Sequence, residues 1–154
     1  MLSIRKLNKD ELLHIAELRW QFQTEQLEQP GNKQEFLVAC VNQLKSPEMA
    51  NYVHFGALLG DNIIAIASLC VISMVPRPHK VIDQFGYLTN VYTIPQFRSQ
   101  GIGSQLIEFI HDYAITQDLE LLLVWPSDGS IEFYKSLDYC MEGQPLIKKL
   151  REYK

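Results

Sequence analysis

Runs of apolar residues predict several strands in this chain. Tyr52 to Leu59 and Ile63 to Met74 are rich in β-branched, aromatic and aliphatic residues, and Gly60-Asp61-Asn62 lies between them. A short linker of these residue types between two such runs is typical of a β-hairpin. The second run is apolar at nearly every position, which predicts a central strand covered on both faces. Leu119 to Trp125 has the same character and predicts another buried strand.

Apolar residues at helical spacing predict four helices. The segment from Lys9 to about Leu27 has apolar residues at i, i+3 and i+4 positions, and Lys33 to Leu44 repeats this pattern. A third apolar stripe runs from Gly101 to Thr116 and favours a helix that packs on a sheet. A short fourth helix is expected from Ile131 to about Leu137.

Three further strands complete the predicted fold. They are expected at Ser3–Leu7, Gln84–Ile94 and Gln144–Leu150. The resulting order is β-α-α-β-β-β-α-β-α-β, which indicates an α/β fold with a mixed central sheet and helices on both faces. A chain of 154 residues fits one domain with a core of its own, so residues 1–154 are expected to form a single domain.

The turn between the strand Gln84–Ile94 and the helix from Gly101 is suited to an anion. Pro95 ends the strand because proline cannot donate to a ladder. The first turn of the next helix leaves N–H groups without intrahelical partners, and together with the helix dipole they favour a phosphate. The glycines at 101 and 103 let the backbone come close, and Arg98 adds a cation with a donor fork.

The spacing of this turn disfavours two common nucleotide motifs. A dinucleotide fingerprint needs a third glycine at position 106, which is Leu106, and a P-loop needs Gly-Lys-Ser/Thr, which does not follow. The remaining pattern, Arg98-Ser99-Gln100-Gly101-Ile102-Gly103, resembles the acetyl-CoA signature of the GCN5-related N-acetyltransferases (GNAT family), Arg/Gln-x-x-Gly-x-Gly/Ala. The alternative is a glycine turn that only joins a strand to a helix.

A second segment strengthens the resemblance. Phe133 to Tyr139 is similar to the family's FYxxxGF segment, with Asp138 in place of glycine and Tyr139 in place of phenylalanine. Aspartate tolerates left-handed backbone, so we expect the turn to form with some strain. The order of elements also matches the GNAT-like fold, so the similarity covers most of the chain and is strongest from Leu88 to Tyr139.

The resemblance implies acetyl-CoA as the cofactor and assigns roles to individual residues. Tyr134 stands where the family has the general acid that reprotonates the leaving CoA thiolate, and the alternative is a core tyrosine. The backbone of Val91 to Thr93 would pair with the pantetheine arm like an added strand. Ser127 and Ser130 would contact the pantetheine or simply cap a helix. The expected cofactor-binding residues are Val91, Tyr92, Thr93, Arg98, Ser99, Gln100, Gly101, Ile102, Gly103, Ser104, Ser127 and Ser130.

No residue is assigned as the general base. Many relatives have a carboxylate on the strand before the glycine turn, but here Thr89 and Asn90 stand there and cannot take a proton at neutral pH. A water relay to Glu25 or His54 is an alternative without support in the sequence. The acceptor pocket is expected between the first two helices and the loops after the two central strands. Its candidate lining residues are Arg19, Trp20, Glu25, Tyr87 and Trp125.

Composition excludes several classes of protein. A net charge of −4 and a pI near 5.5 argue against nucleic-acid binding. The longest apolar run, Ile63 to Val75, is roughly 13 residues and too short to span a bilayer, and the first residues lack the core of a signal peptide. The three cysteines form no Cys-x-x-Cys pair and the four histidines show no metal-ligand spacing. We therefore expect a cytoplasmic protein without a metal.

These observations together predict an enzyme of the GNAT type. It would move an acetyl group from acetyl-CoA to a primary amine of a small molecule or peptide by direct transfer, with both substrates bound at once. The alternative is a non-catalytic acyl-CoA-binding sensor or regulatory module. A dinucleotide oxidoreductase is disfavoured by Leu106 and by the short chain. Assembly into a homodimer is left open.

Overall fold

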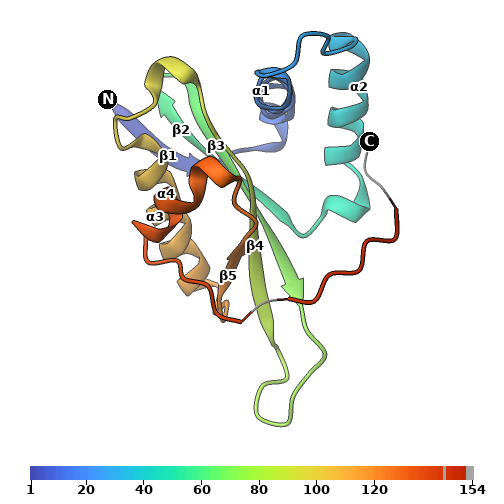
Figure 1. Cartoon of the computed structure of the whole chain (residues 1–154), viewed down its shortest axis with the longest axis vertical. Helices are drawn as coiled ribbons and strands as arrows, with labels where there is room; N and C mark the ends of the chain where they lie inside the picture. Colours follow the sequence, from blue (N-terminus) through green and yellow to red (C-terminus); the bar gives the residue numbers. More distant parts are fainter. Residues whose placement is uncertain (144, 152–154) are drawn as a thin grey trace.

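The computed structural model describes residues 1–143 and 145–151 (Figure 1). Its order is strand, two helices, three strands, helix, strand and helix, which agrees with the predicted order up to the last helix. The fold is therefore the predicted α/β fold with a mixed sheet. The elements are β1 (Leu2–Lys6), α1 (Leu12–Thr24), α2 (Lys33–Leu44), β2 (Tyr52–Leu59), β3 (Asn62–Ser73), β4 (Gln84–Thr93), α3 (Ile102–Thr116), β5 (Leu122–Val124) and α4 (Ile131–Lys135), with single 3-10 turns at Lys9–Glu11, Pro47–Met49, Pro95–Phe97 and Asp128–Ser130.

The five strands of the described residues form one sheet in the order β1-β2-β3-β4-β5. Neighbours from β1 to β4 are antiparallel, whereas β5 runs parallel to β4 after the crossover through α3. α3 and α4 lie on one face of the sheet and α1 and α2 lie on the other (Figure 1). Helices thus cover both faces, as predicted.

Two apolar clusters hold these layers together. On one face the sheet packs against the apolar stripe of α3, in which Leu106, Ile107 and Ile110 are fully buried. On the other face Leu18 of α1 packs with Tyr92 of β4. β3 contributes to both clusters and is buried along its whole middle part. This confirms the predicted central strand that is covered on both faces.

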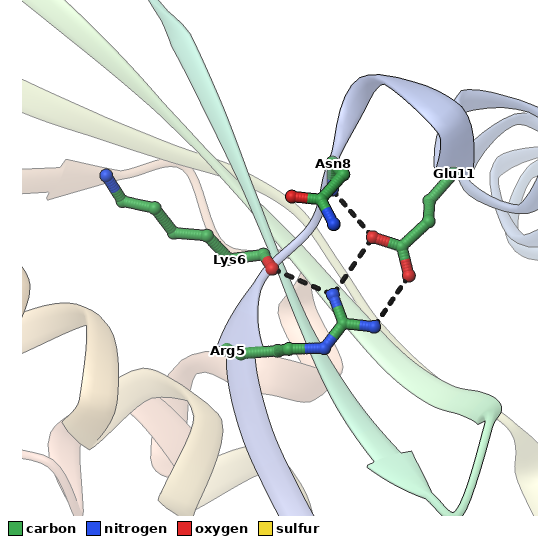
Figure 2. A network of polar contacts seen from close by, with 4 residues as sticks. All are labelled: Arg5, Lys6, Asn8 and Glu11. Atoms are coloured by element: carbon green, nitrogen blue, oxygen red, sulfur yellow. Dashed lines mark hydrogen bonds and ion pairs between the residues drawn. The ribbon is translucent and has the colours of Figure 1, made fainter.

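A carboxylate ties the end of β1 to the start of α1 (Figure 2). Glu11 Oε1 accepts a hydrogen bond from Arg5 Nη2 at 2.7 Å, and Glu11 Oε2 accepts from Arg5 Nη1 at 2.9 Å and from the Asn8 backbone N–H at 2.6 Å. The hydrogen bonds from Arg5, more than the one from Asn8, hold the pKa of Glu11 at about 2. The network connects the strand directly to the first turn of the helix that follows.

The predicted last strand, Gln144–Leu150, is wrong over its described part. Residues 145–150 form no strand, and Gln144 lies outside the described residues. Pro145 has no N–H to donate to a ladder, and Leu146 and Leu150 are exposed instead of packed on the sheet. β5 therefore lies at the edge of the sheet that the described residues form.

The strand predicted from Leu119 to Trp125 is shorter and less buried than expected. Its paired part is Leu122–Val124, which is half-buried, and the Trp125 side chain is 60% exposed. An edge strand has a neighbour on one side only, which accounts for its partial burial. Of the residues that the structure describes, none belongs to a helix with the length and apolar character needed to cross a membrane.

Candidate functional site

β4 carries a bulge near its middle. Tyr92 pairs with Ile66 and Thr89 pairs with Ser68, so β4 has one residue more than β3 between these two pairs. Asn90, inside the bulge, has a φ of +54°, a left-handed conformation that asparagine tolerates better than most residues. A bulge bends its strand and re-aims a side chain. The bulge was not predicted, although an asparagine within a β-rich run is a signal for one.

Beyond the bulge, β4 has an open edge. Its pairing with β5 ends at Leu88, opposite Val124, whereas β4 itself continues to Thr93. Among the described residues, no strand pairs with this side of β4 from Thr89 onward. The outward N–H and C=O groups of this edge can pair with an extended ligand like an added strand, although the Thr93 carbonyl already accepts a hydrogen bond from Arg98 Nε.

The glycine turn presents backbone N–H groups at the start of α3. Ser99 and Gly101 have φ values of +58° and +76°, and the first bond of the helix runs from the Gln105 N–H to the Gly101 carbonyl. The N–H groups of Ile102 and its two successors therefore have no intrahelical acceptor. α3 is 15 residues long, so its dipole adds to the attraction for an anion at this end.

Gly103 brings the glycine turn to the end of β4. A Cβ atom at this position would lie 3.6 Å from Thr93 Oγ1 and 3.5 Å from the Phe133 ring. The open end of β4, the first turn of α3 and helix α4 thus meet at one residue that has no side chain. This arrangement fits a ligand with an extended arm along β4 and phosphate groups at the start of α3.

A pocket of about 410 Å³ lies between helices α1 and α2 and the sheet, and we call it the helix–sheet pocket. Its wall on β4 is the bulge, because Thr89 and Asn90 both line it. The lining residues are Ile15, Arg19, Phe36, Cys40, Gln43, Leu44, Met49, Tyr52, His54, Ser68, Thr89 and Asn90.

Side chains from α1, β2, β3 and β4 form a continuous series of polar contacts in this pocket. Arg19 Nη1 donates to Asn90 Oδ1 at 3.3 Å, and Asn90 Nδ2 donates to Ser68 Oγ at 3.4 Å. Ser68 Oγ lies 2.7 Å from His54 Nδ1. Burial lowers the pKa of the His54 imidazole, which is therefore neutral near pH 7. Ser68, which no sequence pattern indicated, lies between Asn90 and His54 in this series of contacts.

Tyr134 is both a core residue and a protonated phenol. Its side chain is 6% exposed and its ring packs edge-on against those of Phe133 and Tyr139, at centroid distances of 5.1 and 5.4 Å. Burial, and to a smaller extent Tyr87, raises the pKa of Tyr134 to about 12. The hydroxyl therefore keeps its proton across the physiological pH range, although it is a weaker acid than a phenol in water.

Comparisons with known proteins agree with this geometry. Residues 11–139 match the family described as Acetyltransferase (GNAT) family. The chain belongs to this family. As a GNAT member it is an acyl-CoA-dependent N-acyltransferase that uses acetyl-CoA, and the acceptors of the family are amines of small molecules or peptides.

Solved GNAT structures share the fold at low sequence identity. A predicted acetyltransferase from Clostridium acetobutylicum, crystallised with acetyl-CoA, is 21% identical with a TM-score of 0.77, and 97% of each chain is covered. A GCN5-related N-acetyltransferase from Ralstonia eutropha is 18% identical with a TM-score of 0.77, covering 97% of this chain and 99% of the other. An integron cassette protein from V. cholerae has a TM-score of 0.81 at 17% identity, with 98% and 93% covered. No curated protein matches the sequence.

In this GNAT protein Arg98 is tied to other parts of the chain. Its Nε donates to the Thr93 carbonyl at 3.0 Å, and its Nη2 forms a 2.8 Å ion pair with Glu25 just after α1. The guanidinium also lies 5.4 Å from the centre of the Tyr92 ring. The hydrogen bond from Arg98 lowers the pKa of Glu25, so this carboxylate is a weaker proton acceptor than an isolated glutamate. The Arg98–Glu25 pair was not predicted, because it joins residues 73 positions apart.

The other predicted site residues of the GNAT fold lie in several places. Ser127 and Ser130 bond to one another, with the Ser127 hydroxyl donating to Ser130 Oγ at 3.1 Å and the Ser130 hydroxyl donating to the Ser127 carbonyl at 2.9 Å. Both hydroxyls thus stabilise a local turn before α4. Asp138 has a φ of +66°, which confirms the expected left-handed turn after this helix. Val91 is half-buried at the edge of the larger core cluster.

Of the predicted acceptor-lining residues, Arg19 lines the helix–sheet pocket. Trp20 lines a second, larger cavity of about 750 Å³ between α1 and the β2–β3 turn. Tyr87 and Trp125 pack edge-on at 5.5 Å where β4 and β5 part. Neither cavity includes the glycine turn, whose backbone N–H groups at the start of α3 are suited to phosphate.

Proposed function

We propose that this chain is an N-acetyltransferase that moves the acetyl group of acetyl-CoA directly to a primary amine of a small molecule or peptide. Residues 1–154 would act as a single catalytic domain. The observation that carries the proposal is the bulge of β4, whose Thr89 and Asn90 form a wall of the helix–sheet pocket and also begin the open edge of β4. An amine in the pocket and an extended cofactor along the edge would therefore meet at the bulge.

The chain's own groups hold the cofactor in this proposal. The backbone from Val91 to Thr93 pairs with an extended arm, and the N–H groups at the start of α3, in the segment Arg98–Ser104, bind the phosphates. Gly103 leaves room between them because a side chain there would point at Thr93 and Phe133. Ser127 and Ser130 line the approach to α4. When bound, acetyl-CoA supplies an acetyl group activated as a thioester.

The reaction then depends on the positions of the two substrates and on two proton movements, one from the amine and one to the leaving sulfur. The pocket and the β4 edge hold amine and acetyl carbon together, which replaces an unfavourable encounter in water. A backbone N–H of the bulge polarises the acetyl carbonyl, since the extra residue of a bulge is unpaired in the ladder. Tyr134 Oη would donate the proton that the leaving sulfur requires, and burial keeps that proton in place until then. The proton that the attacking nitrogen loses would pass to water, from which the Tyr134 phenolate would be reprotonated.

The cofactor site is tested by calorimetric titration of acetyl-CoA into the wild type, Gly103→Ala and Gly103→Trp. A Cβ at Gly103 makes only ordinary contacts, at 3.5 Å and beyond, so Gly103→Ala should retain binding. The indole of Gly103→Trp would occupy the space beside Thr93 and should abolish binding. Equal affinity in all three proteins, or none in the wild type, contradicts the proposed site.

The rival function is a non-catalytic acyl-CoA-binding sensor or regulatory module. The observation that favours it is the absence of a carboxylate at Thr89 and Asn90, where a general base is usual. Release of coenzyme A with a broad panel of amines separates the two functions. Turnover that depends on the amine supports the transferase, and cofactor binding without turnover on any amine supports the sensor.

A further inference from the structure

Arg19 is a partly buried cation that no carboxylate of the described residues neutralises. Among the described residues Arg5, Arg77 and Arg98 each form an ion pair, whereas Arg19 contacts an uncharged amide oxygen of Asn90. Its guanidinium also lies 5.6 Å from the centre of the Phe22 ring. Burial lowers the pKa of Arg19, and the two groups that act in the opposite direction, Cys40 and Tyr87, are a thiol and a phenol and not carboxylates. A buried charge without a counter-ion is costly and is usually compensated by a partner.

The described residues that form the wall around Arg19 add no negative charge. None of the twelve residues that line the helix–sheet pocket is an aspartate or a glutamate. The larger cavity on the other side of α1 differs, because Glu17 and Asp61 line it together with Lys33. The helix–sheet pocket thus has an unbalanced positive charge, and the larger cavity contains charges of both signs.

The directions of these hydrogen bonds leave a further donor, on His54, in the pocket wall. A guanidinium only donates, so Asn90 accepts through Oδ1 and donates through Nδ2 to Ser68 Oγ. The single Ser68 proton is then free to satisfy His54 Nδ1 at 2.7 Å. Neutral His54 consequently carries its own proton on Nε2, by this assignment of the network. Its Nδ1 is occupied and does not serve as a general base, whereas its Nε2–H is a further donor.

We propose that the helix–sheet pocket binds an amine that also carries an anionic group, either a carboxylate or a phosphate, and that the Arg19 guanidinium binds this group. The inference rests on the proposed function for the amine's role as acceptor, but the anion site itself does not. A pocket of about 410 Å³ suits a small molecule. Apolar side chains at Ile15, Phe36 and Leu44 would surround the rest of the acceptor.

The test uses probes in matched pairs. α-Amino acids with small, branched and aromatic side chains are compared with their amides, and O-phosphoethanolamine is compared with ethanolamine. Binding is measured by NMR on the His54 imidazole signals and by calorimetry, with and without coenzyme A, and acetyl transfer is measured separately. The wild type should bind at least one anionic member about 10- to 100-fold more tightly than its neutral partner, the range expected for one charge-assisted contact. The amino-acid and phosphate pairs show which anion it is.

Three variants identify the residue that binds the anion. Arg19→Met keeps an unbranched apolar chain in place of the aliphatic part of Arg19 and removes the charge, so it should remove the preference for the anionic probe, and Arg19→Lys should restore part of it. Lys33→Met is the matched control, because it removes a positive charge from the larger cavity and should leave the preference intact. Thermal unfolding and binding of coenzyme A report whether each variant is folded.

The outcomes separate this inference from the proposed function. Equal affinity for charged and neutral probes, an Arg19→Met variant that keeps the preference, or no probe binding more tightly than about 10 mM overturns the inference. Transfer to neutral amines with equal efficiency would retain the transferase and reject the anion site. Arg19-dependent anion binding without any acetyl transfer would retain the anion site and reject the transferase.

Discussion

The ion pair at the start of α1 makes a quantitative prediction for Glu11→Gln. This substitution preserves the size of the side chain but replaces a carboxylate that accepts three hydrogen bonds, two from Arg5 and one from the Asn8 N–H (Figure 2). Since Glu11 connects β1 to the helix that carries Arg19, the variant also tests how firmly one wall of the helix–sheet pocket is held.

The magnitude follows from the pKa of Glu11, which the folded protein lowers from 4.5 to about 2. Such a change corresponds to at most about 3 kcal/mol of folding free energy. Water screens the pair, because the Arg5 side chain is 44% exposed and that of Glu11 is 17% exposed. Exposed ion pairs contribute up to about 1 kcal/mol, and the backbone N–H bond adds to this, so we expect Glu11→Gln to cost about 1 to 2 kcal/mol at pH 7.

The same cost should depend on pH. A carboxyl group with a lowered pKa in the folded state stabilises the fold above its unfolded value of 4.5, and this contribution is lost as the pH falls through about 2. Urea unfolding of wild type and Glu11→Gln between pH 7 and pH 2 measures it. Glu28→Gln, at an exposed position outside the ion pairs of the described residues, is the charge-matched control. A Glu11→Gln effect within about 0.5 kcal/mol of zero at pH 7, or one that persists unchanged at low pH, would refute the reasoning.

Four further predictions concern the activity of the site and the stability of the fold around it. Tyr134→Phe should retain affinity for acetyl-CoA and lower turnover by about 100-fold or more, as measured by steady-state kinetics, and unchanged turnover would reject the general acid. Glu25→Gln should release Arg98 toward the phosphates and tighten binding of coenzyme A by up to about fivefold in calorimetry, whereas weaker binding would mean that the pair positions Arg98 productively. Gly101→Ala should lose about 1 to 2 kcal/mol in urea unfolding because its φ is +76°, and an unchanged midpoint would contradict that strain. Because burial lowers the pKa of His54, its contribution to stability is complete above its ordinary pKa of 6.5 and declines below it, so His54→Gln should flatten this part of the pH–stability curve.

Local patterns were sufficient to predict most elements of the fold. The apolar stripe of α3 and the continuous apolar run of β3 depend on neighbours a few residues apart, and both elements form as expected. The left-handed turn at Asp138 was also predictable, because it depends on the tolerance of one residue type. The last predicted strand failed because an apolar run with exposed side chains and a proline at its start has no sheet neighbour within the described residues.

Features that depend on distant partners were not predictable in the same way. The bulge in β4 arises from its register with β3, and Asn90 enters the pocket because of that register. The sequence identified Arg98 as a cation for phosphate, but the structure pairs it with Glu25. Arg19 was among the expected lining residues, but that it has no carboxylate partner among the described residues depends on how the fold brings α1, β2 and β4 together.

In the proposed function, the bulge lets one strand contact both the acceptor and the cofactor. Without the extra residue, β4 would keep its alternation of faces from Leu88 to Thr93, and Asn90 would hold an ordinary extended backbone. With it, Asn90 reaches Arg19 and Ser68 on the helix side, while the same stretch of β4 has already parted from β5. A backbone irregularity of this kind costs stability and persists where the surrounding structure over-determines it. The chemistry of this chain is therefore expected at Thr89 and Asn90, although neither side chain can act as an acid or a base near neutral pH.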